Sequence, residues 1–307
     1  MRIGFVLPHI GPLAGPAALT RVARAVEDAG LDSVWVNERS LWPTDPINPY
    51  PLGSLPLEYK TVIDPLDALT FVAATTSRVL LGTSVLNLPW YNPLLLARRL
   101  TALDVLSGGR LVAGIGSGWS KDEHVAANSD WHTRGARSDE GIALLKAVWT
   151  TDPVEFAGAH YTVPRSYVSL KPVQRPHPPL VWGGWGPAAK KRAATVCDGW
   201  HPAGLPVAEL APQLAEVRAL AAAAGRDPQQ LRFIAKNGLE LTDAPLGAGR
   251  AAFAGSAAEI AADLEVAQAA GVHDLCLDCL LAPGVDTVDA MVEQVLAVAR
   301  IAGRQGR

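Results

Sequence analysis

The sequence predicts a (β/α)8 barrel, and three observations lead to this prediction. Short, mostly apolar runs of strand length alternate with longer segments of helical apolar spacing, and the pair occurs eight times along the 307 residues. Runs such as Leu80–Leu86 and Leu111–Ile115 are typical of parallel strands buried on both faces. The length also suits such a barrel, which commonly takes ~250 residues as one domain. We therefore expect a single TIM-barrel domain over residues 1–307.

The strand and helix pairs follow one another in order, and their ends carry capping signals. Asp64-Pro65 and Asn92-Pro93 have the pattern of an N-cap followed by an N1 proline, and Gly30 follows a helix as a C-cap glycine does. The strands are expected near residues 3–7, 33–37, 79–86, 111–115, 180–183, 198–201, 232–236 and 273–280. The helices are expected near residues 16–29, 64–77, 93–106, 134–149, 187–196, 207–224, 256–270 and 286–302.

Two stretches interrupt this alternation. Residues 40–63 are rich in proline and aromatic residues and follow the second strand, so we expect a lid or a wall of the pocket. Residues 151–179 begin with a hairpin pattern and end in a proline-rich segment that has to be extended. We interpret them as an excursion between the fourth helix and the fifth strand.

Composition narrows the class of protein. The formal net charge is −3 and no basic patch stands out, which argues against a nucleic-acid partner. The apolar stretches are too short to span a membrane, and the chain starts directly with a strand, so we expect a cytoplasmic protein. Cys276 and Cys279 have C-x-x-C spacing but lie in a strand pattern, where residues three apart point to opposite faces. We expect reduced thiols there.

Ligands of such barrels bind at the carboxyl ends of the strands, which directs attention to residues just after them. His9 follows the first strand and His201 the sixth. No histidine or carboxylate pattern of a metal site is present, so we expect none. The run Gly183–Gly186 ends the fifth strand and opens a helix, where backbone N–H groups can bind a phosphate. The alternative is that these glycines only allow the chain to turn and bind no ligand.

Several motifs together resemble the luciferase-like superfamily, in order along nearly the whole chain. They are Gly82-Thr83-Ser84-Val85-Leu86 with Asn92-Pro93, Leu106-Ser107-Gly108-Gly109-Arg110, Gly114–Trp119, Lys171-Pro172-Val173-Gln174, Gly183-Gly184 and Ala194–Trp200. Within the superfamily the chain is most similar to actinobacterial oxidoreductases that depend on coenzyme F420, a deazaflavin. Other members use FMN, as monooxygenases or reductases.

The resemblance implies a cofactor ring over the carboxyl ends of the strands, supported by a non-prolyl cis peptide bond that maps to Ser84–Val85. A member that acts on a sugar phosphate has a catalytic Glu where Trp119 stands, which disfavours that substrate. Polar positions after the fourth strand map to Trp119, Asp122 and Glu123. The implied cofactor-binding residues are Ser84, Val85, Asn87, Trp119, Asp122, Gly184, Trp185 and Gly186.

The superfamily has an acidic residue followed by His after the second strand, and here these positions are Glu38 and Arg39. Guanidinium stays protonated, so Arg39 cannot shuttle a proton as imidazole does. It can stabilise negative charge on a reduced ring or an anionic substrate, with Glu38 holding it in place. The alternative is an ion pair without a function. If Arg39 is only scaffold, His9 and His201 are the next candidates for the proton donor.

The resemblance implies an oxidoreductase that transfers hydride between coenzyme F420 and a small organic substrate. The cofactor carries the redox step, and the protein orients it and the substrate. An FMN-dependent monooxygenase is the alternative, and a cofactor-binding protein without turnover is a third possibility. We also expect a homodimer. Aromatic residues near the rim favour an apolar or planar substrate; they are Trp42, Trp90, Tyr91, Trp119 and Trp185.

Overall fold

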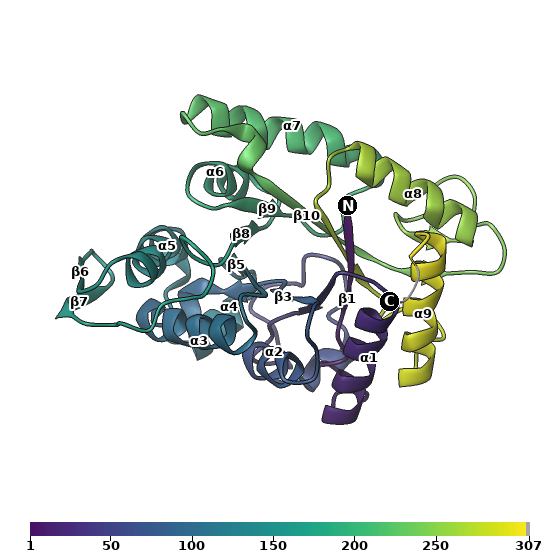
Figure 1. Ribbon diagram of the computed structural model, residues 1–307, viewed down its shortest axis with the longest axis horizontal. Helices are drawn as coiled ribbons and strands as arrows, with labels where there is room; N and C mark the ends of the chain where they lie inside the picture. Colours follow the sequence, from purple (N-terminus) through teal and green to yellow (C-terminus); the bar gives the residue numbers. More distant parts are fainter. Residues whose placement is uncertain (305–307) are drawn as a thin grey trace.

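The computed structural model describes residues 1–304, and its centre is a closed barrel of parallel strands (Figure 1). Eight strands form the ring, and the pairing of β3 with β5 closes it. This confirms the predicted fold class. The ring strands are β1 (Arg2–Val6), β2 (Ser33–Val36), β3 (Leu80–Thr83), β5 (Leu111–Gly116), β8 (Leu180–Gly183), β9 (Gly199–His201), β10 (Arg232–Gly238) and β13 (Asp274–Asp278).

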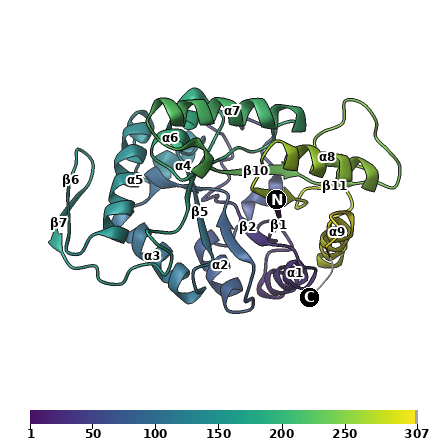
Figure 2. The same ribbon diagram turned by 45° about the horizontal axis from the view of Figure 1, so that its top comes forward.

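Eight helices cover the outside of the ring, as Figures 1 and 2 show. The predicted caps are confirmed: the Asp64 carboxylate accepts from Leu66 N at 2.9 Å, and the Asn92 side chain accepts from Leu94 N at 3.0 Å. No helix within residues 1–304 is long and apolar enough to cross a membrane. The covering helices are α1 (Pro16–Asp28), α2 (Pro65–Ala73), α3 (Pro93–Leu106), α5 (Arg134–Thr150), α6 (Pro187–Thr195), α7 (Val207–Ala223), α8 (Ala257–Ala269) and α9 (Val288–Ile301).

The remaining elements belong to the connections. They are β4 (Leu86–Asn87), β6 (Val154–Ala157), β7 (Thr162–Ser166), β11 (Glu240–Leu241), β12 (Ala254–Gly255), the short helix α4 (Lys121–Ala126), and the 3-10 turns η1 (Leu57–Lys60), η2 (Leu88–Trp90), η3 (Trp131–Thr133) and η4 (Pro228–Gln230). The expected hairpin is confirmed as the antiparallel pair β6–β7, which projects from the barrel beyond α5 (Figure 2).

Some predicted boundaries are wrong. The third strand was expected to run to residue 86, but it ends at Thr83 because the Ser84–Val85 peptide bond is cis, and pairing resumes in β4. The second helix ends at Ala73, where the hydroxyl of Thr76 donates to Val72 O at 2.9 Å. Helix α4 was not predicted, since it is only six residues long. The prediction of one domain over residues 1–307 stays a prediction, and residues 305–307 lie outside the described part.

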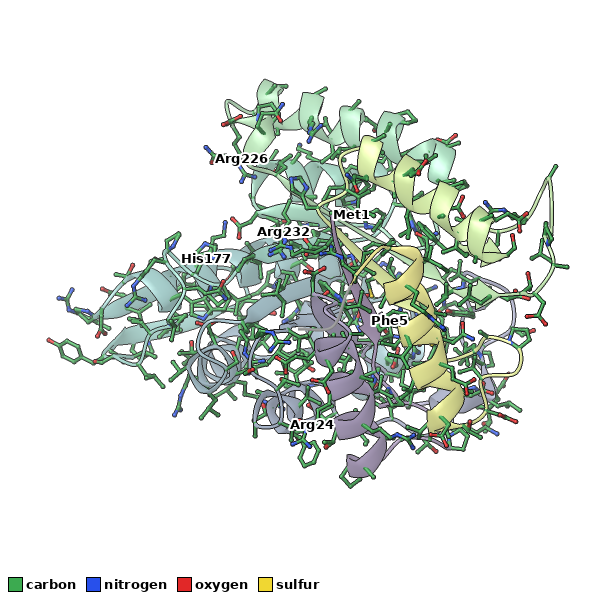
Figure 3. The ribbon with its side chains drawn as sticks, turned by 45° about the vertical axis from the view of Figure 1, so that its right-hand side comes forward. Met1, Phe5, Arg24, His177, Arg226 and Arg232 are labelled. Atoms are coloured by element: carbon green, nitrogen blue, oxygen red, sulfur yellow. The ribbon has the colours of Figure 1, made fainter. Side chains whose placement is uncertain are left out.

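Side chains that point into the barrel form layers, because every second residue of a strand faces inward. At the amino end of the strands, Asp274 binds Arg2 at 2.7 Å and Arg232 at 2.6 Å, and Figure 3 labels Arg232 and Met1, which belong to this end. Above this layer lies a buried apolar cluster of Val6, Trp35, Val112, Val181, Ile234 and Cys276. These two layers fill the barrel from below, so a pocket can open only at the carboxyl ends.

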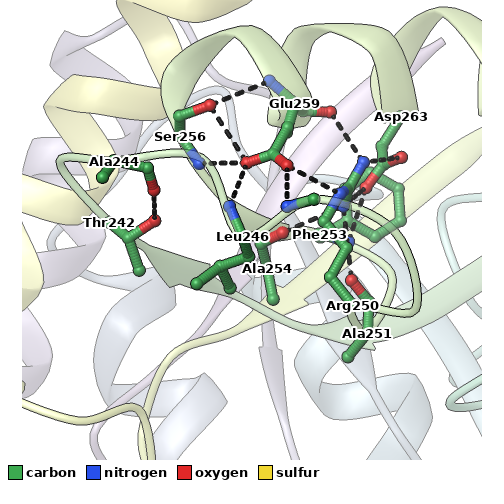
Figure 4. Close-up of polar contacts among 11 residues, drawn as sticks. Thr242, Ala244, Leu246, Arg250, Ala251, Phe253, Ala254, Ser256, Glu259 and Asp263 are labelled. Carbon is green, nitrogen blue, oxygen red and sulfur yellow. Dashed lines mark hydrogen bonds and ion pairs between the residues drawn. The ribbon is translucent and has the colours of Figure 1, made fainter.

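The loop between β10 and α8 is attached by the first turn of α8, as Figure 4 shows. The Glu259 carboxylate accepts from Leu246 N at 3.1 Å and Gly247 N at 2.8 Å. Arg250, inside the loop, binds Asp263 of the same helix at 2.6 Å. In the β6–β7 hairpin, Glu140 of α5 plays the same part by accepting from three backbone N–H groups of the turn.

Candidate active site

A pocket of about 480 Å³ opens at the carboxyl ends of the strands. The predicted wall formed by residues 40–63 is confirmed, since Tyr50, Leu52 and Tyr59 line it. Of the predicted aromatic rim, Trp119 and Trp185 line the pocket, whereas Trp42, Trp90 and Tyr91 do not. Its other lining residues include Asn37, Glu38, Arg39, Ser84, Val85, Asn87, Gly116, Gly183, Gly184, His201, Lys236, Asn237 and Asp278.

One side of the pocket, formed by the ends of β4, β5 and β8, is a glycine wall around Val85. A Cβ atom on Gly116 would lie 2.8 Å from Val85 Cγ2, and one on Gly183 would lie 3.0 Å from Val85 Cγ1. A side chain at Gly116 would therefore overlap Val85, and one at Gly183 would press against it. The cis peptide bond predicted at Ser84–Val85 is present and carries Val85 into this wall.

The glycine run after β8 turns the chain into α6. Gly184 has φ of +115°, a conformation that favours glycine, and its carbonyl accepts from Trp200 Nε1 at 2.8 Å. Trp185 is 41% exposed, and its indole N–H donates to Ala203 O. Gly184 and Trp185 line the pocket, whereas Gly186, the N-cap of α6, does not.

Glu38 is a buried carboxyl group at the pocket. It accepts hydrogen bonds from Asn87 N, from Asn87 Nδ2 at 3.0 Å, and from the Tyr91 hydroxyl. Burial raises the pKa of Glu38 from 4.5 to about 7, against the opposing effect of these donors. Glu38 can therefore gain and lose a proton near neutral pH.

Arg39 has a partner that the sequence did not indicate. The expected pairing with Glu38 is wrong: Arg39 Nη2 lies 2.6 Å from the buried carboxylate of Glu123 on α4. The guanidinium also lies 4.5 Å from the Trp119 ring centroid, a cation–π contact. Glu123 additionally accepts from Ser40 N at 2.7 Å. The Arg39 side chain is thus a buried cation at the pocket that is paired with Glu123, and it does not lie on the surface.

His201 faces the pocket as a neutral imidazole. Its Nδ1–H donates to Ile234 O at 2.9 Å, so its Nε2 accepts from the Ser84 hydroxyl, also at 2.9 Å. Burial lowers the pKa of His201 to about 4. This histidine holds Ser84 next to the cis peptide bond and carries no charge at neutral pH.

Two of the predicted site residues lie outside the pocket wall that residues 1–304 form, in addition to Gly186. His9 is fully buried, where its Nδ1–H donates to Leu7 O and its Nε2 accepts from Asn37 N, both at 2.8 Å. Burial lowers the pKa of His9 as well. Asp122 accepts from Ile47 N at 3.1 Å and so attaches the 40–63 loop.

Sequence reasoning missed a charged wall on the other side of the pocket, at the ends of β2, β10 and β13. Lys236 Nζ lies 3.0 Å from Asp278 Oδ2 and donates to Asn37 Oδ1 at 2.8 Å. Burial acts to lower the pKa of Lys236, but the Asp278 carboxylate outweighs it and raises that pKa. Lys236 follows Ile234 by two residues and so shares its face of β10, but only the structure shows that this face points into the barrel.

Two curated proteins of known activity are similar to this chain in sequence. The chain is 36% identical over 155 residues to FMNH2-dependent dimethylsulfone monooxygenase of Pseudomonas putida, covering 50% of this chain and 42% of that protein. It is 34% identical over 192 residues to F420-dependent glucose-6-phosphate dehydrogenase of Amycolatopsis mediterranei, covering 61% and 53%. The chain thus matches about half the length of these curated relatives.

The fold also matches a solved structure over nearly its whole length. Monooxygenase RslO1 from Streptomyces bottropensis superimposes with a TM-score of 0.79 at 22% identity, covering 98% of both chains. At this identity the likeness concerns the fold alone. The family model for luciferase-like monooxygenases matches residues 1–245, about four fifths of the sequence. The chain therefore belongs to the luciferase-like monooxygenase family.

Proposed function

We propose that this protein is an oxidoreductase that binds coenzyme F420 and transfers hydride between it and a small organic substrate. The observation that carries the proposal is the glycine wall around Val85, at the carboxyl ends of the strands. Because side chains are absent at Gly116 and Gly183, the Val85 side chain packs against both glycines, and it offers a flat ring an apolar surface in the pocket. The name of the Amycolatopsis relative supports F420 as the cofactor, and that of the Pseudomonas relative supports FMN as the alternative.

The residues of this chain fit such a group. Ser84, Val85 and the two wall glycines would receive the ring, with Asn87 and Trp119 at its edges. Gly184 and Trp185 lie at the start of α6, where the helix dipole and backbone N–H groups favour a phosphate of the tail. When bound, the cofactor supplies hydride chemistry, and the protein supplies orientation and electrostatics.

Glu38 is the residue that we assign to proton transfer. Arg39 is held by Glu123 and stays charged, and His201 is neutral with both ring nitrogens bonded. Glu38 lines the same pocket, and its pKa of about 7 matches a group that donates or accepts a proton at neutral pH. Arg39 would stabilise negative charge that develops on the bound group.

Binding titrations test the cofactor. The purified protein is titrated separately with F420 and with FMN, followed by fluorescence of the cofactor. We expect F420 to bind at least about tenfold tighter than FMN, a difference of ~1.4 kcal/mol. Tighter binding of FMN, with oxygen consumed on reduction, would replace the proposal by a monooxygenase.

Stopped-flow measurements separate an enzyme from a binding protein. Reduced F420 is mixed with the protein and a panel of small carbonyl and alkene compounds. An enzyme oxidises the cofactor with at least one of them. A protein that binds F420 tightly and oxidises it with none would be a cofactor-binding protein without turnover.

Two further expectations belong to the proposal. Leu95 and Leu106 of α3 are 57% and 68% exposed, and these apolar side chains support a homodimer, which sedimentation would test. The three cysteines are buried and unpaired, which supports a reducing compartment such as the cytoplasm.

A further inference from the structure

The charged wall faces the glycine wall across the barrel. The ring order β2–β1–β13–β10–β9–β8–β5 places the ends of β2, β13 and β10 on the side away from β5 and β8. If the ring of the cofactor lies against the glycines, the space on the charged side is left for the substrate. The inference below therefore rests on the proposed function.

Lys236 is fixed in this wall from two directions. Its ammonium binds Asn37 Oδ1 at 2.8 Å and Asp278 Oδ2 at 3.0 Å. Asn37 is itself held by His9, which accepts from Asn37 N at 2.8 Å, and Asp278 accepts from Leu280 N at 3.1 Å. An ammonium group has three N–H donors, so these two partners leave one. Lys236 lines the pocket, and that donor is available to a ligand there.

Asn237, the next residue of β10, has its side chain on the opposite face of the strand from Lys236, since successive side chains alternate. The side chain is 4% exposed, and its Nδ2 donates to Leu205 O at 2.9 Å. Its Oδ1 is buried and has no hydrogen-bond partner within residues 1–304. A buried polar atom without a partner is costly unless a ligand or water satisfies it. The charged wall thus offers a ligand one fixed donor, the remaining N–H of Lys236.

The charges around the pocket nearly cancel. Lys236 is paired with Asp278, and Arg39 is paired with Glu123, so the charge of each cation is already balanced by a carboxylate. Glu38, the other acidic group of the pocket, adds only negative charge. A carboxylate or phosphate would gain little here and would lose its hydration.

We propose that Lys236 is a specificity-determining residue, which binds an uncharged oxygen acceptor of the substrate, such as a carbonyl or hydroxyl oxygen, on the wall opposite the cofactor. The bound oxygen then orients the reacting carbon toward the cofactor side of the pocket. Substrates without such an oxygen lose this contact and bind more weakly.

The test compares three probes of similar size in protein saturated with oxidised F420: acetophenone, ethylbenzene and benzoate. Their dissociation constants are measured by quenching of tryptophan fluorescence, since Trp119 and Trp185 line the pocket. We expect acetophenone to bind at least about tenfold tighter than either other probe. In Lys236→Met this preference should fall to less than about threefold, and Lys236→Arg should keep part of it.

Controls separate this effect from a loss of folding or of cofactor binding. Lys191→Met removes an exposed lysine of α6 that lies outside the pocket and should keep the wild-type preference. Lys236→Met combined with Asp278→Asn avoids an unpaired buried carboxylate, should fold, and should also lose the preference. F420 affinity should change by less than about twofold in all of these variants.

Three results would overturn the inference. One is a Lys236→Met protein that retains the preference for acetophenone. Another is tightest binding of benzoate in the wild type, which would make the site anionic. The third is a loss of F420 affinity in Lys236→Met, which would assign the lysine to the cofactor. Failure of wild-type protein to bind F420 or FMN refutes the proposed function instead, and the probes then test Lys236 in the unloaded protein.

Discussion

The two walls of the pocket differ in what they exclude. In the glycine wall, Val85 fills the space beside Gly116 and Gly183, so under the proposed function this wall would select by shape. The charged wall holds Lys236 between Asp278 and Asn37, so it selects by hydrogen bonding. A substitution in the first wall adds atoms where none fit, whereas one in the second changes a single donor. We therefore expect steric, general effects on one side and selective effects on the other.

The largest effect is expected at Gly116. In Gly116→Val, the added Cβ would lie 2.8 Å from Val85 Cγ2, so either Val85 moves or the new side chain fills the pocket. Cofactor affinity should fall by at least about a hundredfold, ~2.7 kcal/mol, as measured by fluorescence titration. Gly15→Val is the control, because a Cβ there meets no atom within 4 Å. Equal affinity of both variants would show that the glycine wall does not contact the cofactor.

The second largest effect is expected for Glu38→Gln, which should lose turnover but keep its affinity for the cofactor. The amide keeps the size of the side chain but cannot transfer a proton, so the rate should fall by about a hundredfold or more. In the wild type, reduction of substrate should slow as pH rises through about 7, where Glu38 loses its proton. The variant should lack this step in its pH–rate profile. A step that persists would assign the proton to another group.

Arg39→Ala should damage stability more than it damages the cofactor site. It leaves the buried carboxylate of Glu123 without its partner, which typically costs ~3–5 kcal/mol in the free energy of unfolding. Urea denaturation should show this loss, and Arg39→Met combined with Glu123→Gln should recover most of it. Turnover should stay more than about tenfold reduced in both variants if Arg39 stabilises charge in the reaction.

Recovery of full activity in the double variant would make Arg39 scaffold only. Arg39→His is a further variant, in which we expect a new step near pH 6.5 in the pH–rate profile, since imidazole titrates there and guanidinium does not.

Glu38 should also limit the stability of the folded protein at high pH. The pKa of Glu38 in the folded protein, about 7, lies above its ordinary value of 4.5. The contribution of Glu38 to the free energy of unfolding is therefore complete below about pH 4.5 and is lost as pH rises through about 7. Near pH 8, Glu38→Gln should therefore be more stable than the wild type by up to ~3 kcal/mol, and near pH 4 the two should be similar. Thermal unfolding at both pH values measures the difference. A variant less stable at pH 8 would contradict the raised pKa.

The smallest effect on the pocket is expected from Glu259→Gln, which lies far from both walls. The pKa of Glu259 is lowered to about 2, chiefly by the N–H groups of Ser256 and Gly247. The stabilisation of its loop is thus present above the ordinary pKa and is lost as pH falls through about 2. The variant should keep wild-type cofactor affinity and show faster proteolysis within residues 242–255. Unchanged proteolysis would mean that other contacts hold the loop.

The glycine wall could be predicted from the sequence, and the charged wall could not. Gly183, Gly184 and the Ser84–Val85 bond lie in short contiguous motifs, whose backbone requirements are local. Lys236 and Asp278 are 42 residues apart in sequence and meet only because β10 and β13 are neighbours in the closed ring. Strand order in the ring follows from the fold class, but the side chains that share a layer depend on register, which no local pattern specifies.

The roles of the candidate catalytic residues likewise depend on contacts that no local sequence pattern specifies. His9 and His201 both follow a strand, and the sequence treats them alike, yet only His201 ends on the pocket side. The partner of Arg39 was missed because Glu123 belongs to a helix of six residues, too short for a periodic pattern. Glu38 was identified by its position, while its raised pKa depends on burial that only the packed structure provides.

The binding of two excursions by glutamates of neighbouring helices has a consequence for how this barrel can diversify. Glu140 holds the turn of the β6–β7 hairpin, and Glu259 holds the loop before α8, each from a helix adjacent in sequence to the segment it binds. Each excursion and the glutamate that binds it therefore lie in one contiguous segment of the chain, which can be regarded as a cassette. Such a cassette can be lengthened, shortened or exchanged between related barrels, while the ring of strands and both walls of the pocket keep their geometry.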